Sequence, residues 1–252
     1  MFDLAFYTCF YGSDNNLAFT IPPLPSLKYK CYYYTNNKYI FERLRDSKWI
    51  GIYDNKPVSD DLIESSMDSK HIKAMPHEYN ELKDYSYLCY LDSQSKKVNE
   101  TFVESFIFEY FIKRNYILLL REHWVRLNSE GTLALSRTGS SIFPGMVNSK
   151  PMGVWNEYNA SVDQERYRLE SEKYKKYINN QINNGLSEIT EHHCATGFLI
   201  RNMKHEKMNE LNTTWYKHIQ ECGIECQISF FFVKQLFNGY VCSFNQCPFA
   251  FS

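Results

Sequence analysis

The chain has 252 residues, of which 44% are hydrophobic and 23% are charged. This length and composition are typical of a globular protein whose core is large enough to fold without disulfides. Lys and Arg number 28 and Asp and Glu number 29. The balance excludes an overall basic field for nucleic acid and an acidic solvating tail.

The expected compartment follows from what the sequence lacks. No run of about 18 apolar residues is present, so we expect no transmembrane segment. The start, MFDLAFYTCFYG, lacks a basic leader and a small-residue cleavage site and is predicted to form a strand. Most of the eight cysteines lie in apolar runs, which favours buried free thiols in the reducing cytoplasm. We expect at most a peripheral association with a membrane or a larger protein complex.

Strands and helices alternate along the first half of the chain. Apolar and aromatic runs predict strands at 4–12, 30–37, 48–54, 85–92 and 116–122. Helices are predicted at 38–47, at 62–75 between the N-cap cluster Ser59-Asp60-Asp61 and Pro76, and at 102–114. The alternation indicates an α/β fold with a mostly parallel central sheet and helices on both faces.

The second half is predicted to be a helical elaboration on the same sheet. Residues 129–159 are rich in Gly, Ser, Pro and Asn without a clear period, which indicates a lid or binding loop. Ser161 and Gln164 match a capping box that opens a helix ending at Asn183-Asn184-Gly185. A strand at 194–201 and helices at 207–220 and 224–237 follow, the last one apolar almost all round and therefore buried.

Asp92 ends the apolar run YSYLCYLD, at the kind of strand end beyond which ligands bind in parallel sheets. A carboxylate there can hold a divalent metal that neutralises a diphosphate. The alternative is an ordinary Asp that caps the helix starting near Asn99. His192 and His193 are adjacent and point in different directions in an extended chain. Only one of them is therefore expected to help Asp92 hold a metal.

Basic residues cluster near two other predicted element ends. Lys70 and Lys73 share one helix face three residues apart and can receive phosphate oxygens, although a solvated helix face is the alternative. His123 and Arg126 follow a buried strand and can orient a sugar or phosphate, the alternative being a His satisfied beside that strand. The fingerprints of P-loop, dinucleotide-binding and α/β-hydrolase proteins are missing from the sequence.

The order of these motifs resembles that of GT-A-type glycosyltransferases from polysaccharide gene clusters and glycan-building large DNA viruses. Plant relatives of these enzymes contain a "glycosyltransferase-like domain". The most specific matches are K-x-x-K-x-x-P-H at residues 70–77, YLDS at 90–93 and QISF at 227–230. The resemblance spans residues 6 to about 233.

The resemblance implies one GT-A-like (Rossmann-like) domain over 1–252, with a nucleotide-binding half at 1–125 and an acceptor-side half at 126–252. It implies transfer of a sugar from a nucleotide sugar, expected to be UDP-linked, to a hydroxyl of a glycan or glycoconjugate. Asp92, with His193, would hold Mn²⁺ or Mg²⁺. The implied nucleotide contacts are Tyr11, Gly12, Thr35, Asn36, Lys70, Lys73 and His77. The residues implied at the donor sugar or acceptor are His123, Arg126 and Gln227.

Three positions depart from the family pattern. Cys226 replaces the Asp of R-D-Q, Trp124 replaces the Pro of H-P-x-R, and Gln94 occupies a position where a second acid is often found. A catalytically inactive nucleotide- or glycan-binding module is therefore an alternative. A third hypothesis is a zinc-stabilised interaction protein, since four late cysteines are loosely spaced like a zinc site, or like disulfide partners. These cysteines are Cys222, Cys226, Cys242 and Cys247.

Overall fold

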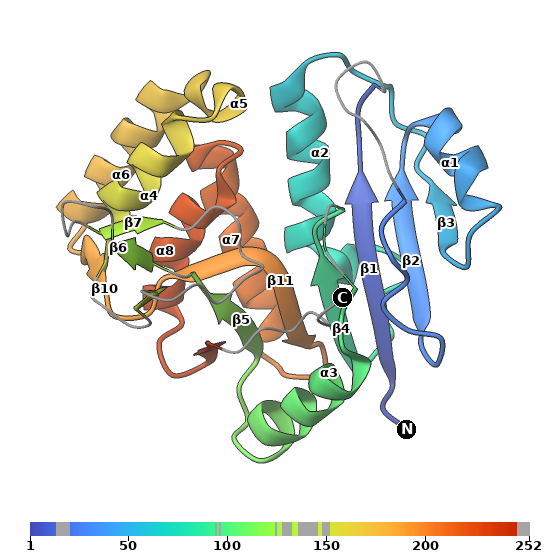
Figure 1. Ribbon diagram of the computed structural model, residues 1–252. Helices are drawn as coiled ribbons and strands as arrows, with labels where there is room; N and C mark the ends of the chain where they lie inside the picture. The colour runs from blue at the N-terminus through green and yellow to red at the C-terminus, as the bar shows by residue number, and fades with distance from the viewer. Residues whose placement is uncertain are drawn as a thin grey trace.

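A seven-stranded sheet organises the computed structural model (Figure 1). Its strands lie in the order β12-β5-β11-β4-β1-β2-β3. They are β1 (Leu4–Phe10), β2 (Lys30–Thr35), β3 (Ile50–Tyr53), β4 (Tyr87–Leu91), β5 (Leu118–Glu122), β11 (Cys194–Asn202) and β12 (Val241–Phe244). Two small sheets are formed by β6 (Val125–Leu127), β7 (Leu133–Leu135) and β8 (Met146–Val147), and by β9 (Met152–Gly153) and β10 (Ile189–Thr190).

Helices connect and cover these strands. They are α1 (Lys38–Leu44), α2 (Leu62–Ala74), the 3-10 turn η2 (Pro76–Glu78), α3 (Glu100–Phe106), its π-helical continuation η3 (Ile107–Ile112), α4 (Val154–Val162), α5 (Glu165–Arg168), α6 (Ser171–Asn183), α7 (Met208–Cys222) and α8 (Cys226–Leu236). The structure describes residues 1–13, 21–93, 95, 97–123, 125–127, 133–135, 146–147 and 152–245, with backbone alone for 125–127, 133–135 and 146–147. No helix in these ranges combines the length and apolar character that a membrane crossing requires.

The predicted fold class is confirmed, because the central sheet is mostly parallel. The pairs β1–β2, β2–β3, β1–β4 and β5–β12 are parallel, and β11 is antiparallel to both β4 and β5. The carboxyl ends of β1 to β5 therefore meet at one edge of the sheet, together with the first residues of β11. At such an edge, open α/β sheets bind their ligands.

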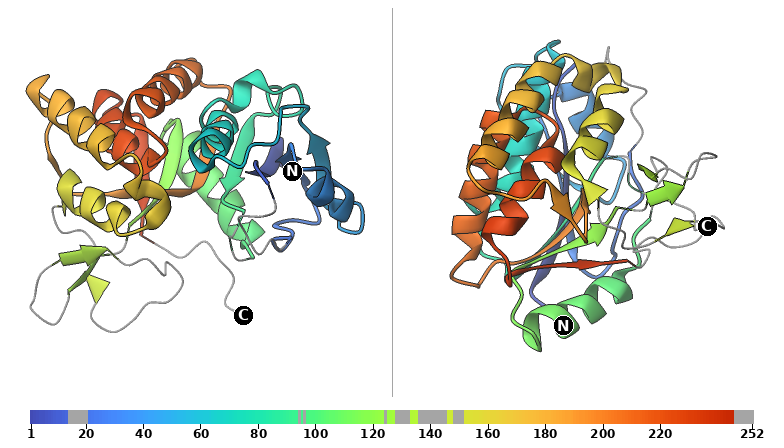
Figure 2. Two further views of the ribbon diagram at one scale, coloured as in Figure 1. Left: turned by 90° about the horizontal axis from the view of Figure 1, so that it is seen from above. Right: turned by 90° about the vertical axis from the view of Figure 1, so that its left-hand side faces the viewer.

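Side chains alternate between two cores along each strand, as the period of a strand requires. In β1, Tyr7 and Cys9 pack in the core beneath α2, α7 and α8, whereas Phe6 and Phe10 pack in the core beneath α1 and α3. The views in Figure 2 show helices on both sides of the sheet. In β4, Leu88 and Tyr90 belong to the α2 side, so the next residue of that series, Asp92, also points toward α2.

Helix α8 lies between the sheet and a third core, which explains why it is apolar almost all round. Phe230 and Val233 pack on the sheet side, while Ile228 and Phe232 pack with residues of α4 and α6. The prediction of a buried helix here is confirmed. Because both its sides are held, its first turn has a fixed position at the sheet edge.

The helix predicted from Ser161 is wrong in its start. Ser161 lies inside α4, and the segment folds as the three helices α4, α5 and α6. The Ser161 hydroxyl donates to Glu157 Oε1 at 3.4 Å rather than capping a helix, and Gln164 takes the N-cap position of α5. A local capping signal was overridden by the packing of α4 against α8. The predicted end at Asn183 is confirmed.

Two other elements were not predicted. The strand β12 pairs with β5 at the edge of the sheet, although four residues after a glycine turn gave no clear strand pattern. The segment 129–159, predicted as a loop, contains β7, β8, β9 and the first part of α4 in its described portions. The described late cysteines lie in three different cores: Cys222 beside α4 and α6, Cys226 on the α2 side, and Cys242 on the α3 side. Cys247 lies outside the described residues, and those three do not form one zinc site.

A buried arginine ties the sheet to α2 and α7. Arg201 of β11 is 0% exposed. It donates to Asn212 Oδ1 (3.2 Å), to the Tyr7 hydroxyl (2.8 Å) and to the Lys73 carbonyl (2.6 Å). Burial lowers the pKa of Arg201, although the neighbouring Tyr7, Tyr90 and Cys89 act in the opposite direction. No carboxylate pairs with it among the described residues, so neutral acceptors alone compensate this charge.

We expect Arg201→Met to lower the free energy of unfolding by about 2–4 kcal/mol, since it leaves three buried polar groups with fewer partners. Urea denaturation measures this loss. The control is Arg45→Met, an exposed residue after α1, for which we expect a change within about 0.5 kcal/mol. Equal stability of the two variants would contradict the role given to Arg201.

Candidate functional site

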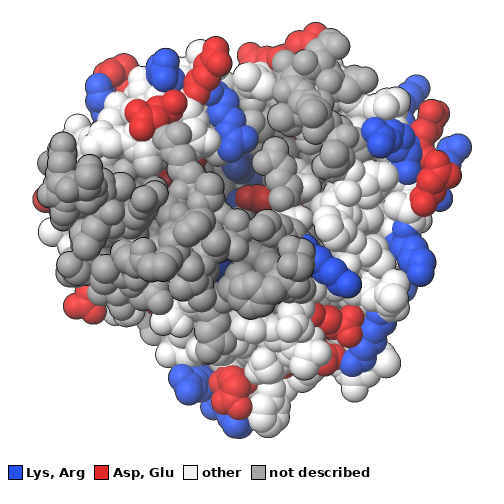
Figure 3. Space-filling model, viewed as in Figure 1, with Lys and Arg blue, Asp and Glu red and all other residues white. Residues whose placement is uncertain are grey.

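A polar pocket of about 280 Å³ lies beyond the carboxyl ends of β4 and β5. Around it lie the ends of those strands, the start of β11, the second half of α2, the segment from α4 to α5, and the first turn of α8. Figure 3 shows basic and acidic atoms meeting in a hollow near the middle of this face. The charged residues that line the pocket are Lys70, Lys73, Asp92, Arg121, Glu157, Arg166 and Glu225.

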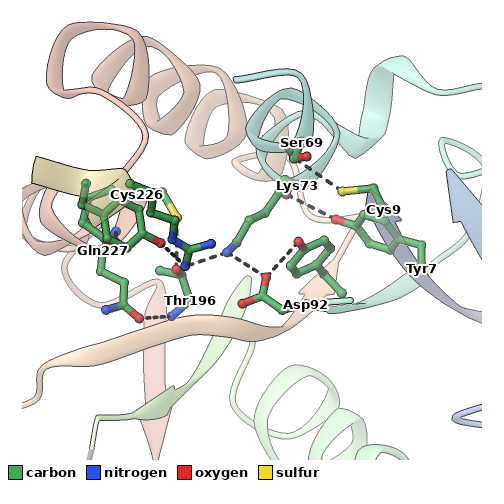
Figure 4. A network of polar contacts seen from close by, with 12 residues as sticks. Tyr7, Cys9, Ser69, Lys73, Asp92, Thr196, Cys226 and Gln227 are labelled. Atoms are coloured by element: carbon green, nitrogen blue, oxygen red, sulfur yellow. Dashed lines mark hydrogen bonds and ion pairs between the residues drawn. The ribbon is translucent and has the colours of Figure 1, made fainter. Parts of the chain in front are cut away.

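Lys73 and Asp92 form the floor of the pocket (Figure 4). The Lys73 ammonium lies 3.4 Å from Asp92 Oδ1 and 3.2 Å from the Thr196 hydroxyl. It also lies 5.0 Å from the centre of the Tyr90 ring, whose hydroxyl donates to Asp92 Oδ1 at 2.9 Å. The Lys73 side chain is 2% exposed and that of Asp92 is 51% exposed. The cation is thus enclosed, whereas the carboxylate is open to the pocket.

A bulge in β11 makes room for this carboxylate. The pairing of β11 with β5 shifts between Ala195 and Leu199. The Asp92 backbone N–H donates to the Gly197 carbonyl at 3.0 Å. A Cβ atom at Gly197 would lie 2.7 Å from Asp92 Oδ2, a contact that side chains cannot adopt. Glycine at this position therefore allows Asp92 to lie against the bulged strand.

The charges around Asp92 keep it ionised. Surrounding protein atoms act to raise the pKa of Asp92, but Lys73, Lys70 and the Tyr90 hydroxyl together hold the pKa below its ordinary value. Asp92 Oδ2 accepts no hydrogen bond from a residue that the structure describes. An anionic oxygen is thus available to a ligand at the bottom of the pocket.

Lys70 is the available cation of the pocket. It lies one helical turn before Lys73 on α2, and its ammonium has no hydrogen-bond or ion-pair partner among the described residues. Burial acts to lower the pKa of Lys70, but the Cys226 sulfur and the carboxylates of Asp92 and Glu225 raise it above its ordinary value. Lys70 therefore stays charged and can receive an anion.

A second hydrogen-bond network, on the side of α4 and α8, forms the wall of the pocket away from Lys73. Glu157 Oε2 lies 2.7 Å from His193 Nε2, and Glu157 Oε1 accepts from Gln227 Nε2 at 2.6 Å. Gln227 Oε1 in turn accepts from the Thr196 backbone N–H at 3.2 Å. Burial acts to raise the pKa of Glu157, but the hydrogen bond and charge of His193, with His123 and Gln227, lower it to about 2. Both carboxylate oxygens of Glu157 and both amide atoms of the Gln227 side chain therefore have a partner, which fixes this wall.

The residues predicted near the sugar or acceptor are partly brought together. His123 and Gln227 line the pocket, and the His123 ring stacks on His193 at 5.6 Å between centroids. Arg126 lies in β6, where the side chains are outside the described part of the chain. His193 does not line this pocket; Glu157 engages its Nε2, and its Nδ1 is buried without a hydrogen bond. Its role as a metal ligand stays a prediction.

Four of the residues predicted to contact the nucleotide, Tyr11, Gly12, Thr35 and Asn36, form a separate buried cluster at the ends of β1 and β2, whereas Lys70 and Lys73 line the pocket. Asn36 accepts from the Gly12 N–H at 3.0 Å and donates to the Pro57 carbonyl at 2.8 Å. The Tyr11 hydroxyl donates to Asp54 at 2.9 Å. Thr35 is fully buried and accepts from the Asn37 N–H. These side chains shape the sheet edge beside the pocket, but they do not line it.

The backbone at Gly12 and the side chain of His77 hold this cluster and the end of α2. Gly12 has φ of +108°, and a Cβ there would lie 2.9 Å from Ser65 Cβ, so only glycine brings β1 this close to α2. His77 lies in η2 just after α2, with Nδ1 3.2 Å from Asn212 Nδ2, and it does not line the pocket.

Several lining residues were not predicted from the sequence. Glu157 lies in a segment that was predicted as a loop, and Arg166 and Tyr167 lie in a helix whose start was misplaced. Glu225 precedes the QISF motif and could have been found as its N-cap. Thr196 had no signal, because its position depends on the bulge in β11.

Comparisons with known proteins give a likeness of fold. No protein-family model matches the chain, and no curated protein matches it. The structure is similar to mouse xyloside xylosyltransferase 1, with a TM-score of 0.44 and 8% identity, over 96% of this chain and 84% of that one. It is also similar to the mannosyltransferase Ktr4p from S. cerevisiae, with a TM-score of 0.39 and 11% identity, over 92% of this chain and 66% of that one.

A second structure of Ktr4p, in complex with GDP, matches with a TM-score of 0.38 and 9% identity over the same shares. This chain therefore spans about two thirds of that mannosyltransferase. At these scores the likeness is one of general architecture and does not bear on reaction or substrate.

The Glu157 network predicts a pH dependence of stability. The folded pKa of about 2 lies below the ordinary value of 4.5. The stabilisation is therefore complete above about pH 4.5 and is lost as the pH falls toward the folded pKa. We expect Glu157→Gln to melt below wild type at pH 7, and the difference in Tm to narrow between about pH 5 and pH 3. A difference in Tm that stays constant over this range would contradict this assignment.

Proposed function

We propose that the chain is a glycosyltransferase that moves a sugar from a nucleotide sugar, expected to be UDP-linked, to a glycan hydroxyl. The observation that supports this most is the pocket at the sheet edge, where Lys70 and Lys73 lie beside the open carboxylate of Asp92. Cations at this place would stabilise the charge that develops on a leaving diphosphate. The order of the sequence motifs that resembles GT-A-type enzymes places the same three residues at the donor.

The two lysines would have different tasks. Lys73 is buried and already bonded to Asp92 and Thr196, so it would position Asp92 rather than move to a ligand. Lys70 has no partner among the described residues and would bind a phosphate oxygen of the donor directly. The buried cluster of Tyr11, Gly12, Thr35 and Asn36 would form the wall against which the nucleoside lies, with His77 behind α2.

The described residues of the pocket provide few ligands for a divalent ion. Asp92 offers one free carboxylate oxygen, and the described residues contain no group of three His, Cys, Asp or Glu that could hold a metal. Mg²⁺ and its relatives commonly bind through one or two carboxylates, with substrate phosphates and water completing the shell. Asp92 would thus hold Mn²⁺ or Mg²⁺ only together with the donor. When bound, the ion would act as a Lewis acid for the leaving diphosphate.

A nucleotide- or glycan-binding module without catalysis is the second candidate. The observation that favours it is Cys226, which replaces the acid of the resembling family and is 2% exposed, with its sulfur 3.2 Å from the Thr196 hydroxyl. Such a module would bind UDP and release no nucleotide from any donor.

The first test is nucleotide release from a panel of nucleotide sugars, with and without Mn²⁺. We expect Asp92→Asn to reduce release by about 100-fold or more, because it removes the anionic oxygen at the diphosphate. Thermal melting of the variant shows whether it is folded. Wild-type protein that binds UDP without releasing nucleotide from any donor would favour the binding module, and full activity of Asp92→Asn would contradict the assignment of Asp92.

The second test is the affinity for UDP, measured by calorimetry. We expect Lys70→Met to weaken UDP binding by about tenfold or more, the usual value of a charge-assisted contact. Lys56→Met is the matched control, because this lysine also lies at the sheet edge but pairs with Asp68 at 3.0 Å. Equal weakening by both variants would indicate a general effect of charge rather than a contact from Lys70.

A further inference from the structure

Glu225 is a buried carboxylate that opens into the pocket. It precedes α8 as its N-cap, and its residue is 5% exposed. Oε1 accepts from the Gln227 backbone N–H at 3.0 Å. Oε2 makes no hydrogen bond with a described residue, yet Glu225 lines the pocket. An acceptor oxygen that is enclosed by protein and has no partner is available to a ligand in that cavity.

The other two carboxylates of the pocket have side-chain partners from other elements, although Asp92 keeps its Oδ2 open. Asp92 accepts from Tyr90 and lies beside Lys73, and both oxygens of Glu157 are hydrogen bonded. Of these three acids, Glu225 is thus the one whose carboxylate is hydrogen bonded, among the described residues, only by its own helix. The cation Lys70 lies in the same pocket. The pocket therefore contains a cation for a leaving phosphate and a separate free carboxylate.

Cys226 also lines the pocket, but it offers a thiol, which contacts Thr196, rather than a carboxylate. It is buried against Thr196 in the core on the α2 side, because the first residue of α8 points into the sheet. The residue before it turns its side chain back over the helix end and into the pocket. The acid missing at position 226 thus has a counterpart one residue earlier, with different geometry.

We propose that Glu225 accepts the proton of the hydroxyl that attacks the sugar. This inference rests on the proposed transfer from a nucleotide sugar. As the acceptor oxygen forms its bond to the anomeric carbon, its O–H proton passes to Glu225 Oε2. The bond from the anomeric carbon to the phosphate oxygen breaks, and its electron pair leaves with the nucleoside diphosphate. The step is a single displacement, so it inverts the anomeric carbon.

The surroundings of Glu225 suit a proton acceptor near neutral pH. Burial raises the pKa of Glu225, and the charge of Glu157 raises it further, while Lys70, the Gln227 N–H and Arg166 act to lower it. The net pKa lies above the ordinary value, whereas that of Asp92 lies below it. The titratable and charged groups that face Glu225 are Lys70 of α2, Glu157 of α4, Arg166 and Tyr167 of α5, Tyr174 of α6, Cys222 of α7 and Cys226 of α8.

Donor hydrolysis tests the proposal without knowledge of the acceptor, because water then supplies the attacking hydroxyl. The probe is the nucleotide sugar from which wild-type protein releases nucleotide fastest. We expect Glu225→Gln to lower kcat by about 100-fold or more, with UDP affinity by calorimetry unchanged within about twofold. We expect Glu225→Asp to recover part of the rate. In wild type, kcat/KM should fall at acid pH as Glu225 becomes protonated. This fall should be absent in Glu225→Gln.

The matched control is Asp61→Asn, which removes the charge of another helix N-cap, that of α2, outside the pocket. For this variant we expect the kcat of wild type and the same dependence of kcat/KM on pH. If wild type hydrolyses no donor, the proposed function itself fails. If wild type hydrolyses a donor and Glu225→Gln hydrolyses it at the same rate, only the inference about Glu225 is overturned. The same holds if NMR spectra recorded early in the reaction show that the released sugar retains its anomeric configuration.

Discussion

The enclosed ammonium of Lys73 is the interaction on which the pocket depends. A buried charge without partners is costly, so the elements around it must supply them. Here β4 supplies Asp92 and the ring of Tyr90, and the bulge of β11 supplies Thr196. Three segments distant in sequence are thereby fixed around one atom. The floor of the pocket is consequently formed before any ligand enters.

The backbone of Lys73 is also fixed by hydrogen bonds. The last carbonyls of a helix lack partners within the helix, and near the end of α2 the Lys73 carbonyl accepts from Arg201 and from the Tyr7 hydroxyl. Arg201 therefore positions α2 rather than binding a ligand. Since Lys70 lies one turn earlier on the same helix, its direction into the pocket follows from this fixation.

Local patterns predicted the elements that local physics determines. The first five strands are near-continuous apolar runs between clear turn residues, and Asp61 and Pro76 mark the ends of α2. The period of β4 places Asp92 on the α2 side, so its meeting with Lys73 could be predicted. The sequence could not predict that β11 runs in the reverse direction or that Glu157 lines the pocket. Both features depend on which segments pack together. At Ser161 the local pattern predicted a helix start, but the burial of α4 places this residue inside a helix instead.

The charges of the pocket connect the proposed role of the donor site with that of Glu225. Among the described lining residues, four Lys and Arg face three Asp and Glu, which leaves a single formal positive charge. That charge is too small to match a diphosphate, so a divalent ion on Asp92 would complement it. Departure of the nucleotide adds one negative charge to the leaving group, on the side of Lys70. A proton taken up by Glu225 removes one negative charge at the same moment. The negative charge would therefore move from Glu225 to the leaving diphosphate, where cations that are already in position stabilise it without reorganisation.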